Sequence, residues 1–548
     1  MIAGFQRWWY TVRPLRAVQV FGRIWYRIYR PSVDRSPAPP LRRVSPAAEA
    51  GASREPSMLG ADTFCLLNET YSLREMSGWD DPAVSKLWRY NLHYFDDLNA
   101  SAATDRTSWH RALIDRWLTE VKPGLRSSGW EPYPTSLRMV NWIRWYLAGN
   151  DLSESARQSL ATQSRWLSRR LEHHLLGNHL WANAKALVFA GVAFDGPQSS
   201  RWLDRGLALV DREIGEQILA DGGHFELSPM YHAIILNDLL ELIALDLAMP
   251  NALPKGAVLR WRGIVPRMLD WLNAMSHPDG DIALFNDAAF GVAPRAADLE
   301  AFAKRLGIAA PPLTDFRMVD LAASGYVRLQ KVGAVLIADA TEVGPTYLPG
   351  HAHADTLTFE LSIGGERCVV NGGTSRYDTS PERLSQRGTA SHNTVVVNGE
   401  NSSEVWSSFR VARRASPVGK RVYEHDEQQI LECAHDGYKR LSPSCIHHRK
   451  WTLQDGRLLV EDWIEGNFGT ATARYHLHPS VKVELVEPSS GFLHLPGGRV
   501  VPFKAHGARC LIAASRYHPG FNQSLHSQCI ELSFETDRCS FELSWPNQ

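Results

Sequence analysis

The sequence of 548 residues lacks three features, each of which would indicate a particular class of protein. It has no surplus charge, because 59 Lys and Arg balance 59 Asp and Glu, which argues against nucleic acid as a partner. It has no uninterrupted apolar run of about eighteen residues, the length that indicates a membrane-spanning helix. Its seven cysteines are widely spaced and include no CxxC pair, which argues against a disulfide framework and a thiolate zinc site.

Aromatic residues are what the chain has in abundance: 19 Trp, 16 Tyr and 19 Phe, together with 21 His. Aromatic rings pack in protein cores and also stack on sugar rings, so the composition is compatible with a carbohydrate ligand. Charged residues make up 22% and hydrophobic residues 44%, as in folded globular chains. Because the length exceeds that of one ordinary domain, we expect a folded protein with more than one.

Residues 1–60 form a basic, aromatic N-terminal segment followed by a Pro-rich linker. The segment begins MIAGFQRWWYTVRPLRAVQVFGRIWYRIYR, in which arginines interrupt every apolar run, and the first acidic residue is Asp34. This is not the pattern of a secretion signal, so we expect a cytoplasmic protein. The pattern predicts one or two amphipathic helices. They either pack on their own protein or attach it peripherally to an anionic surface, in this case the inner membrane face.

The rest of the chain divides into two parts with different hydrophobic periods. In residues 61–315 apolar residues recur at i, i+3 and i+4, as in AIILNDLLELIALDLA, which predicts helices in series. Paired helices closed into an α/α toroid fit this pattern, and so does a bundle or a solenoid. In residues 316–548 the period becomes 2, as in TLTFELSIGGERCVV, which predicts an antiparallel β-sandwich. The fold class is therefore α+β multidomain, with a ligand cleft expected between the domains.

Two polar clusters interrupt the helical pattern. In DGGHFELSPMYH, Ser228 is placed to cap a helix that has Pro229 at its first position, and Tyr231 follows in the first turn. Tyr231 either transfers a proton or packs beside the cap. In GNHLWANA, Asn178 and His179 lie at a break between helices, where an amide and an imidazole either bind a carboxylate or cap the next helix.

The strand-rich part contains a further cluster of histidines. In GHAHADTLTFEL, His351 and His353 lie on one face if the segment is extended, so they present two imidazoles to a metal or a substrate. In SHNTVVVNG, His392 begins another strand. An HxH pair with a third, distant His is a pattern found in metal sites.

These segments together resemble the heparinase II/III-like superfamily of polysaccharide lyases, the alginate lyase and heparinase type. The motifs that carry the resemblance occur in order along most of the chain: NLHYFDDL (91–98), GWEPYPTSLRMVNWI (129–143), GNHLWANA (177–184), DGGHFELSPMYH (221–232), GHAHADTLTFEL (350–361), VVNGGTSRY (369–377) and SHNTVVVNG (391–399). The resemblance implies an N-terminal incomplete α/α toroid and a C-terminal antiparallel β-sandwich. It also implies β-elimination on an acidic, uronate-containing polysaccharide.

The resemblance assigns catalytic roles to four residues. β-Elimination must neutralise the uronate carboxylate, remove the weakly acidic C5 proton and protonate the leaving oxygen at C4. By the resemblance, Asn178 and His179 neutralise the carboxylate. Tyr231 corresponds to the family's acid, which in some members is also the base. His351 corresponds to the histidine that acts as base or assists it.

The resemblance also implies groove residues and a metal site. Arg138 and Glu226 are candidates for the substrate groove or its support. Tyr377 matches a tyrosine found near the Gly-rich turn.

The metal site of the family is a structural Zn²⁺ site in the β-sandwich. It uses a His like His353, an acid from the strand before the Gly-rich turn, and a His like His392. In this chain that strand ends in Asn371, and an amide is a poor zinc ligand. We therefore expect either a weakened metal site or a hydrogen-bonded histidine pair.

Two other classes of function compete with a lyase. A glycoside hydrolase on an α/α toroid would need two carboxylates flanking the scissile bond, whereas the clusters here are His, Tyr and Asn. A non-catalytic glycan-binding or scaffold protein of polysaccharide biosynthesis would fit the altered metal strand. The product separates the three, because only a lyase creates an unsaturated uronate.

Overall fold

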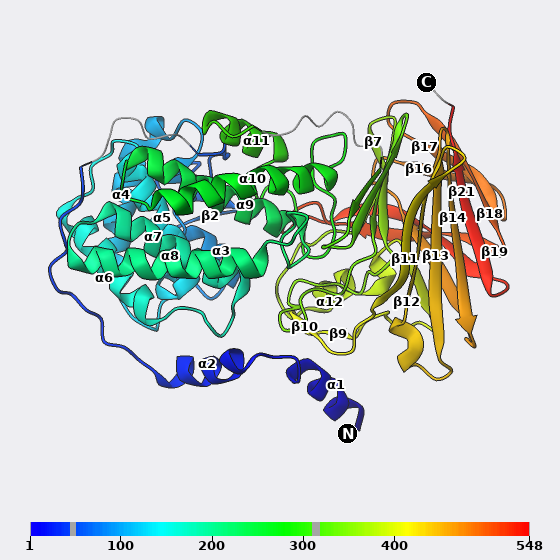
Figure 1. Ribbon diagram of the computed structural model, residues 1–548, viewed down its shortest axis with the longest axis horizontal. Helices are drawn as coiled ribbons and strands as arrows, with labels where there is room; N and C mark the ends of the chain where they lie inside the picture. Colours follow the sequence, from blue (N-terminus) through cyan, green and yellow to red (C-terminus); the bar gives the residue numbers. More distant parts are fainter. Residues whose placement is uncertain (1, 44–50, 310–317, 547–548) are drawn as a thin grey trace.

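The computed structural model describes residues 2–43, 51–309 and 318–546 (Figure 1). A helical half, residues 61–309, lies beside a sandwich half, residues 318–546, and the N-terminal helices lie outside both. The expected order of a helical part followed by a strand-rich part is confirmed. The predicted boundary at 315 and 316 lies outside the described residues.

The helical half is built from helices whose starts are encoded locally. Ser85, Ser153 and Ser228 accept a backbone N–H at the first turns of three of these helices, as capping serines do. Pro132, Pro197 and Pro229 lie in the first turns of three helices, and the third of these helices also has the Ser228 cap. The helices are α3 (Lys86–Leu92), α4 (Thr107–Glu120), α5 (Pro132–Leu147), α6 (Glu154–Arg169), α7 (Gly177–Ala193), α8 (Pro197–Gln217), α9 (Pro229–Ala248), α10 (Lys255–Ala274) and α11 (Ala296–Arg305).

Tryptophan fills the core of the helical half. Several indoles there are fully buried, among them Trp88, Trp117, Trp142, Trp181 and Trp261. A large aromatic ring contributes more buried apolar area than an aliphatic side chain, so these residues dominate the packing. Much of the aromatic surplus of the sequence therefore stabilises the fold.

The sandwich half consists of antiparallel sheets. A five-stranded sheet contains β3 (Met318–Leu321), β4 (Tyr326–Lys331), β5 (Ala334–Asp339), β6 (Phe359–Ile363) and β7 (Glu366–Val369), in that order among the described residues. The largest described sheet has the order β11 (Pro417–His425), β12 (Gln428–His435), β13 (Cys445–Gln454), β14 (Arg457–Gly466), β21 (Arg538–Ser544), β18 (Val500–His506), β17 (Ser490–His494) and β16 (Lys482–Glu487).

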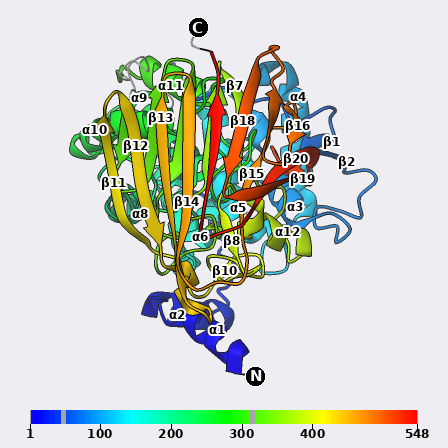
Figure 2. The same cartoon turned by 90° about the vertical axis from the view of Figure 1, so that its right-hand side faces the viewer.

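A further described sheet closes the sandwich, with the order β19 (Ala508–Tyr517), β20 (Leu525–Phe534), β15 (Ala471–His476) and β8 (Val395–Val397). Residues from these three sheets share one apolar core. Strand β14 alternates between partly exposed and buried side chains, as expected for a strand with one face on that core. The turned view shows the long strands β11 to β14 side by side (Figure 2).

Smaller elements surround the junction of the two halves. Strands β1 (Thr63–Leu66) and β2 (Glu69–Ser72) form a hairpin on the helical half. Helix α12 (Pro381–Gln386) and the strands β9 (Val405–Trp406) and β10 (Arg410–Val411) lie on the sandwich half near the junction (Figure 1).

Apolar side chains join the two halves directly. Leu227 and Trp271 of the helical half pack in one buried cluster with Tyr326 of the sandwich half. Met230 shares a second cluster with Phe521. These contacts hold the start of α9 against the sandwich.

The N-terminal strap, which we define as residues 2–30, crosses the junction of the two halves. It contains α1 (Ile2–Val12) and α2 (Ala17–Ile28), drawn in dark blue in Figure 1. Within the described part of the chain, every helix is too short or too polar to cross a membrane.

Candidate active site

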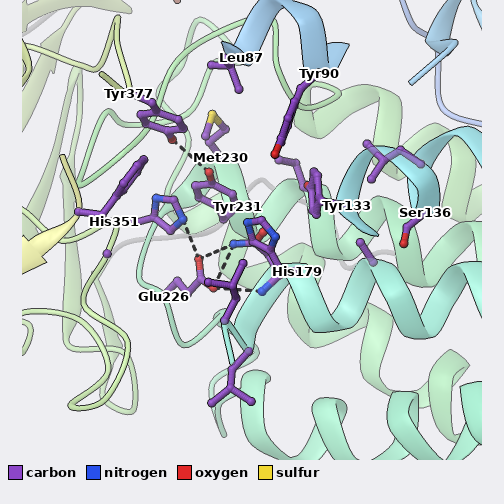
Figure 3. A pocket seen from close by; sticks show the side chains of 18 of the residues that line it. Leu87, Tyr90, Tyr133, Ser136, His179, Glu226, Met230, Tyr231, His351 and Tyr377 are labelled. Atoms are coloured by element: carbon purple, nitrogen blue, oxygen red, sulfur yellow. Dashed lines mark hydrogen bonds and ion pairs between the residues drawn. The ribbon is translucent and has the colours of Figure 1, made fainter. Parts of the chain in front are cut away.

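A cavity of about 690 Å³ lies between the helical half and the sandwich half (Figure 3). Its lining includes all four residues to which the sequence assigned catalytic roles: Asn178, His179, Tyr231 and His351. These residues span more than 170 positions of sequence, from α7 to the loop before β6. Their predicted convergence on one cleft is confirmed, and the roles assigned to them stay predictions.

Asn178 is held in the first turn of α7 by a tight turn and a buried carboxylate. Leu176 and Gly177 both have positive φ, and a Cβ at Gly177 would lie 2.3 Å from Oε1 of Glu226. The Asn178 Nδ2 donates to Glu226 at 3.1 and 3.2 Å, and its backbone N–H donates at 3.2 Å. Because an amide nitrogen carries two hydrogens, one can bind Glu226 while the other serves a ligand.

His179 lies in the cleft beside a buried carboxylate. Its Nδ1 lies 3.2 Å from Oε1 of the buried Glu172, and its ring lies 4.6 Å, between centroids, from that of Tyr133. Burial works against protonation, but the Glu172 carboxylate outweighs it and raises the pKa of His179. About a third of the side chain, 34%, remains exposed, so the imidazole is accessible to a ligand in the cleft.

Tyr231 holds a phenol proton at the centre of the cleft. Ser228 caps α9 by accepting from the Tyr231 N–H at 3.3 Å, which fixes the tyrosine in the first turn. The Tyr231 hydroxyl lies 3.1 Å from that of Tyr377, which comes from the sandwich half. Burial, reinforced by Tyr377, raises the pKa of Tyr231 well above its ordinary value. The phenol is therefore protonated at neutral pH, as a general acid must be.

His351 lies against Tyr231, with ring centroids 4.1 Å apart. Its Nδ1 is 2.9 Å from Oδ2 of Asp287, and its Nε2 is 3.6 Å from Oε2 of Glu226. A hydrogen bond from Nδ1–H to Asp287 leaves Nε2 as the nitrogen that can take a proton. The two carboxylates then stabilise the imidazolium that forms.

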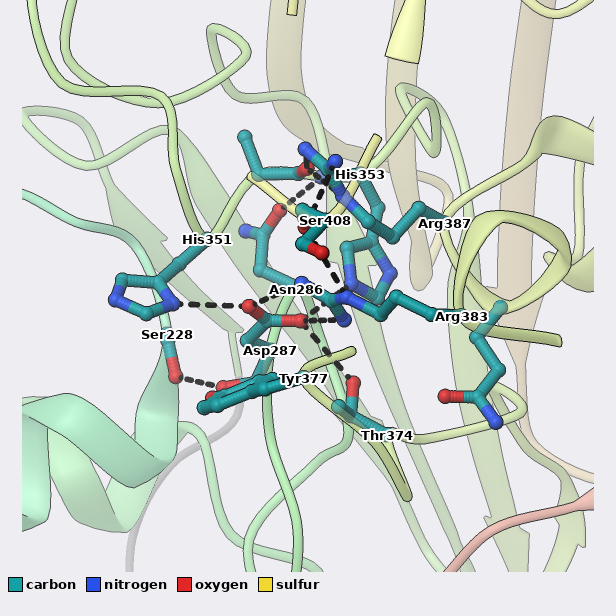
Figure 4. A network of polar contacts seen from close by, with 12 residues as sticks. Ser228, Asn286, Asp287, His351, His353, Thr374, Tyr377, Arg383, Arg387 and Ser408 are labelled. Carbon is teal, nitrogen blue, oxygen red and sulfur yellow. Dashed lines mark hydrogen bonds and ion pairs between the residues drawn. The ribbon is translucent and has the colours of Figure 1, made fainter. Parts of the chain in front are cut away.

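Asp287 is the centre of a buried polar network that the sequence did not reveal (Figure 4). It lies in the helical half, after α10, yet it contacts both His351 and His353, and Arg383 binds both of its oxygens. Burial alone would raise its pKa, but Arg383 and the two histidines hold the pKa of Asp287 well below its ordinary value. It is therefore a carboxylate that orients His351.

Two of the three predicted groove residues line the cleft, and the third does not. Glu226 and Tyr377 line the cleft, and Glu226 acts there as a support for Asn178 and His351. Arg138 does not line it, so of the two roles predicted for Arg138 only support of the groove remains a prediction. Its guanidinium is buried in the helical core, donates to Gln163 at 3.0 Å and stacks on Trp117 at 4.0 Å.

The histidines of the predicted metal site do meet, and the third ligand beside them is Asp355 in place of the predicted Asn371. His353, Asp355 and His392 are buried, and each offers a ligand atom within 4.8 Å of the others. The Asn371 Oδ1 accepts from Thr358 at 2.7 Å and lies 3.2 Å from the His392 Nδ1, so Asn371 orients His392 from behind. The sequence had not indicated Asp355, although it follows the HxH pair by two positions.

The chemistry of this donor set fits a divalent cation. One oxygen of Asp355, Oδ2, is buried without a hydrogen-bond partner among the described residues. Burial raises the pKa of Asp355 to about 7. The Nδ1 of His353 and the Nε2 of His392 are 3.2 Å apart, a contact that a shared proton would also satisfy. The arrangement therefore accommodates either an ion or a histidine pair.

The fold and the cleft define a two-part protein, a helical toroid joined to a β-sandwich, with acid–base side chains at the junction. Sequence comparison identifies the family. Residues 138–302 match the family described as Heparinase II/III N-terminus, and residues 314–546 match Heparinase II/III-like, C-terminal. The chain belongs to the heparinase II/III-like superfamily.

Individual relatives are more distant. A heparin-sulfate lyase of Bacteroides stercoris is 25% identical over 324 residues, which cover 55% of this chain and 46% of the relative. A heparin-sulfate lyase of Bacteroides thetaiotaomicron is 26% identical over 483 residues, which cover 76% and 65%. The aligned part of the chain thus spans less than two thirds of each of these relatives. The crystal structure of a heparinase III has the same fold, with a TM-score of 0.71 at 17% identity over 87% of this chain and 81% of that one.

Proposed function

We propose that the protein is a polysaccharide lyase that cleaves a uronate-containing glycan by β-elimination. The observation that carries the proposal is the meeting, in one cleft, of a protonated phenol, a carboxylate-oriented imidazole and a second histidine whose pKa a buried carboxylate raises. Relatives named heparin-sulfate lyase support a glycosaminoglycan as substrate. A hydrolase is less well supported, because Glu226 and Asp287 are committed to Asn178, His351 and Arg383.

The first task of the site is to stabilise the carboxylate of the uronate. Removal of the C5 proton places additional negative charge on that carboxylate. In the proposed complex His179 binds it as a cation and Asn178 donates a hydrogen bond. Both are held in place by Glu172 and Glu226, so little reorganisation is needed as the charge develops.

The second task is proton transfer. The Nε2 of His351 takes the C5 proton, the electrons of that bond form the C4=C5 double bond, and the C4–O4 bond breaks. The Tyr231 phenol gives its proton to the leaving O4. The phenolate that remains accepts a hydrogen bond from Tyr377 and recovers its proton from His351, whose ring is adjacent.

The charges around the cleft support a substrate with few sulfate groups. Most lining cations already neutralise carboxylates, in the pairs Arg54–Asp96, Lys86–Glu131, Arg144–Glu241 and Lys185–Asp238. Arg23 of the strap and Arg410, which stacks on Trp8 of the strap, are lining cations that make no ion pair within the described residues. A densely sulfated chain would have to displace existing ion pairs to be neutralised.

A divalent cation such as Zn²⁺ would be held by His353, Asp355 and His392. When bound, it would neutralise Asp355 and fix the segment that carries His351. This role is structural, because His353 lies behind Asp287 and outside the lining of the cleft.

The product tests the proposed function. Incubation with heparan-, hyaluronan-, alginate- and bacterial-capsule-type polysaccharides should give the ultraviolet absorbance of an unsaturated uronate, with poorly sulfated substrates turned over faster than heavily sulfated ones. New reducing ends without that absorbance would identify a hydrolase. Saturable binding with neither product would identify a glycan-binding protein.

A further inference from the structure

The second helix of the strap exposes a continuous apolar face. Val18, Phe21, Trp25 and Ile28 follow one another at spacings of three and four, so they share one side of α2. Their exposed fractions are 43%, 70%, 61% and 70%. We call these four side chains the outer stripe. Exposed large hydrophobic side chains gathered on one face indicate a surface that is covered in the functional state.

The opposite face of α2 is fixed to the protein, so the stripe cannot turn inward. Gln19 is buried and donates to the Tyr347 carbonyl at 3.1 Å. A Cβ added at Gly22 would lie 3.0 Å from that of His174, which shows how closely the helix approaches the helical half. Tyr26 packs on His174 with ring centroids 4.3 Å apart.

The first helix is anchored on the sandwich half and is also exposed on its far side. Trp8 packs edge-to-face on Trp406 at 5.0 Å, and Thr11 accepts from the Trp406 indole at 3.1 Å. Phe5 and Trp9 of the same helix are 74% and 56% exposed. Both helices therefore have one face docked on the molecule and apolar side chains on the other.

The charge of the strap decides what covers this surface. Arg7, Arg13, Arg27 and Arg30 are exposed and make no ion pair within the described residues. The first acidic residue of the chain is Asp34, which lies beyond the strap. Aromatic and aliphatic side chains flanked by arginines, without acids, match an interface between lipid headgroups and acyl chains that carries negative charge.

We propose that the strap attaches the protein to the surface of an anionic membrane, with α1 and α2 lying in the interface and the outer stripe inserted. The expected inner membrane face is such a surface. Trp8, Val12, Leu15 and Arg23 of the strap also line the cleft. Attachment would hold one end of the cleft next to the bilayer, where glycan that is itself held at the membrane could enter.

Vesicle sedimentation tests the attachment independently of lyase activity. The full chain should bind vesicles of phosphatidylcholine with phosphatidylglycerol at least about tenfold more strongly than vesicles of phosphatidylcholine alone, and salt should weaken binding. The variant Phe21→Ser/Trp25→Ser/Ile28→Ser should lose about tenfold or more of this binding. It should keep its melting temperature, and it should keep its turnover of soluble polymer, because none of the three residues lines the cleft.

A matched control changes equally exposed apolar residues elsewhere. Leu259, Val332 and Val486 are 69%, 61% and 60% exposed, and Leu259→Ser/Val332→Ser/Val486→Ser should bind vesicles as the unchanged protein does. Vesicle binding that is absent, or that the stripe variant retains, would overturn the proposal. So would a dimer that the stripe variant converts to monomer without any vesicle binding, because the stripe would then be covered by a second copy.

Discussion

Tyr231 and His351 reach the cleft from opposite halves. Their proposed proton transfer predicts that turnover falls when the Tyr231 hydroxyl is removed. Tyr231→Phe removes one hydroxyl and its bond to Tyr377 while the ring keeps its packing, so the melting temperature should change little. Turnover should fall by about 10² to 10⁴, the usual contribution of a positioned acid or base. Both quantities should be measured on the same sample. Full turnover by a folded variant would remove Tyr231 from the mechanism.

The contact between His179 and Glu172 predicts that kcat/KM depends on pH. If the His179 cation binds the substrate carboxylate, kcat/KM should fall as the pH rises through the raised pKa of His179. Glu172→Gln removes the charge that raises this pKa, so the alkaline limb of the profile should move to lower pH. An unmoved limb would show that His179 does not set it.

The same pair contributes to stability with a defined sign. Because the folded protein raises the pKa of His179, the pair stabilises the fold fully below about pH 6.5, the ordinary histidine pKa. That contribution is lost as the pH rises through the raised value. The melting temperature of Glu172→Gln should therefore differ most from that of the unchanged protein on the acid side.

Among the elements, the segment between β5 and β6 supplies both the proposed base, His351, and two of the three proposed metal ligands, His353 and Asp355. Elemental analysis should find a divalent ion in the purified protein, and chelator should lower the melting temperature until Zn²⁺ is restored. Asp355→Asn should weaken the response to Zn²⁺, because a carboxylate ligand is lost. A protein without metal, whose melting temperature is unmoved by chelator, would identify a histidine pair.

Elements with local signals were predictable from the sequence. The start of α9 follows from Ser228 and Pro229, and the break before α7 follows from Gly177, because caps and turns act within a few residues. The change of period from 3.6 to 2 likewise predicted the two halves. The residues of the candidate cleft were predicted through the family resemblance of the motifs around Asn178 and His351.

Contacts between distant segments were not predictable in the same way. Asp287 meets His351 across 64 positions and Arg383 across 96, and nothing in the sequence near Asp287 indicates these partners. The position of Arg138 outside the cleft lining could not be predicted either, because helix α5 is buried on nearly all sides and its arginine stacks on Trp117 inside the core. Burial of a helix face depends on its tertiary neighbours, which periodicity alone does not specify.

In the molecule as a whole, the buried ion pair between Asp287 and Arg383 joins the helical half to the sandwich half. Asp287→Asn leaves the Arg383 guanidinium buried without its counter-charge, which should cost about 3–5 kcal/mol of unfolding free energy. Urea denaturation, followed by both helix and sheet signals, should show one shared transition at a lower midpoint. Two separate transitions in the unchanged protein would contradict this coupling.

An exposed ion pair offers the control. Arg260 and Asp211 also form an ion pair, at 2.8 Å, but their side chains are 58% and 48% exposed. Asp211→Asn should therefore cost less than about 1 kcal/mol. Adding Arg383→Met to Asp287→Asn should recover part of the loss, because the Arg383 charge is then no longer buried without its partner.

The buried polar network around Asp287 also limits how this protein can evolve. One carboxylate of the helical half must match an arginine and two histidines of the sandwich half at the same time. A gene fusion that combines this toroid with the sandwich of a distant relative would leave these groups mismatched inside the junction. We therefore expect the two halves to be inherited as one unit, with new specificities arising in the lining of the cleft rather than by exchange of domains.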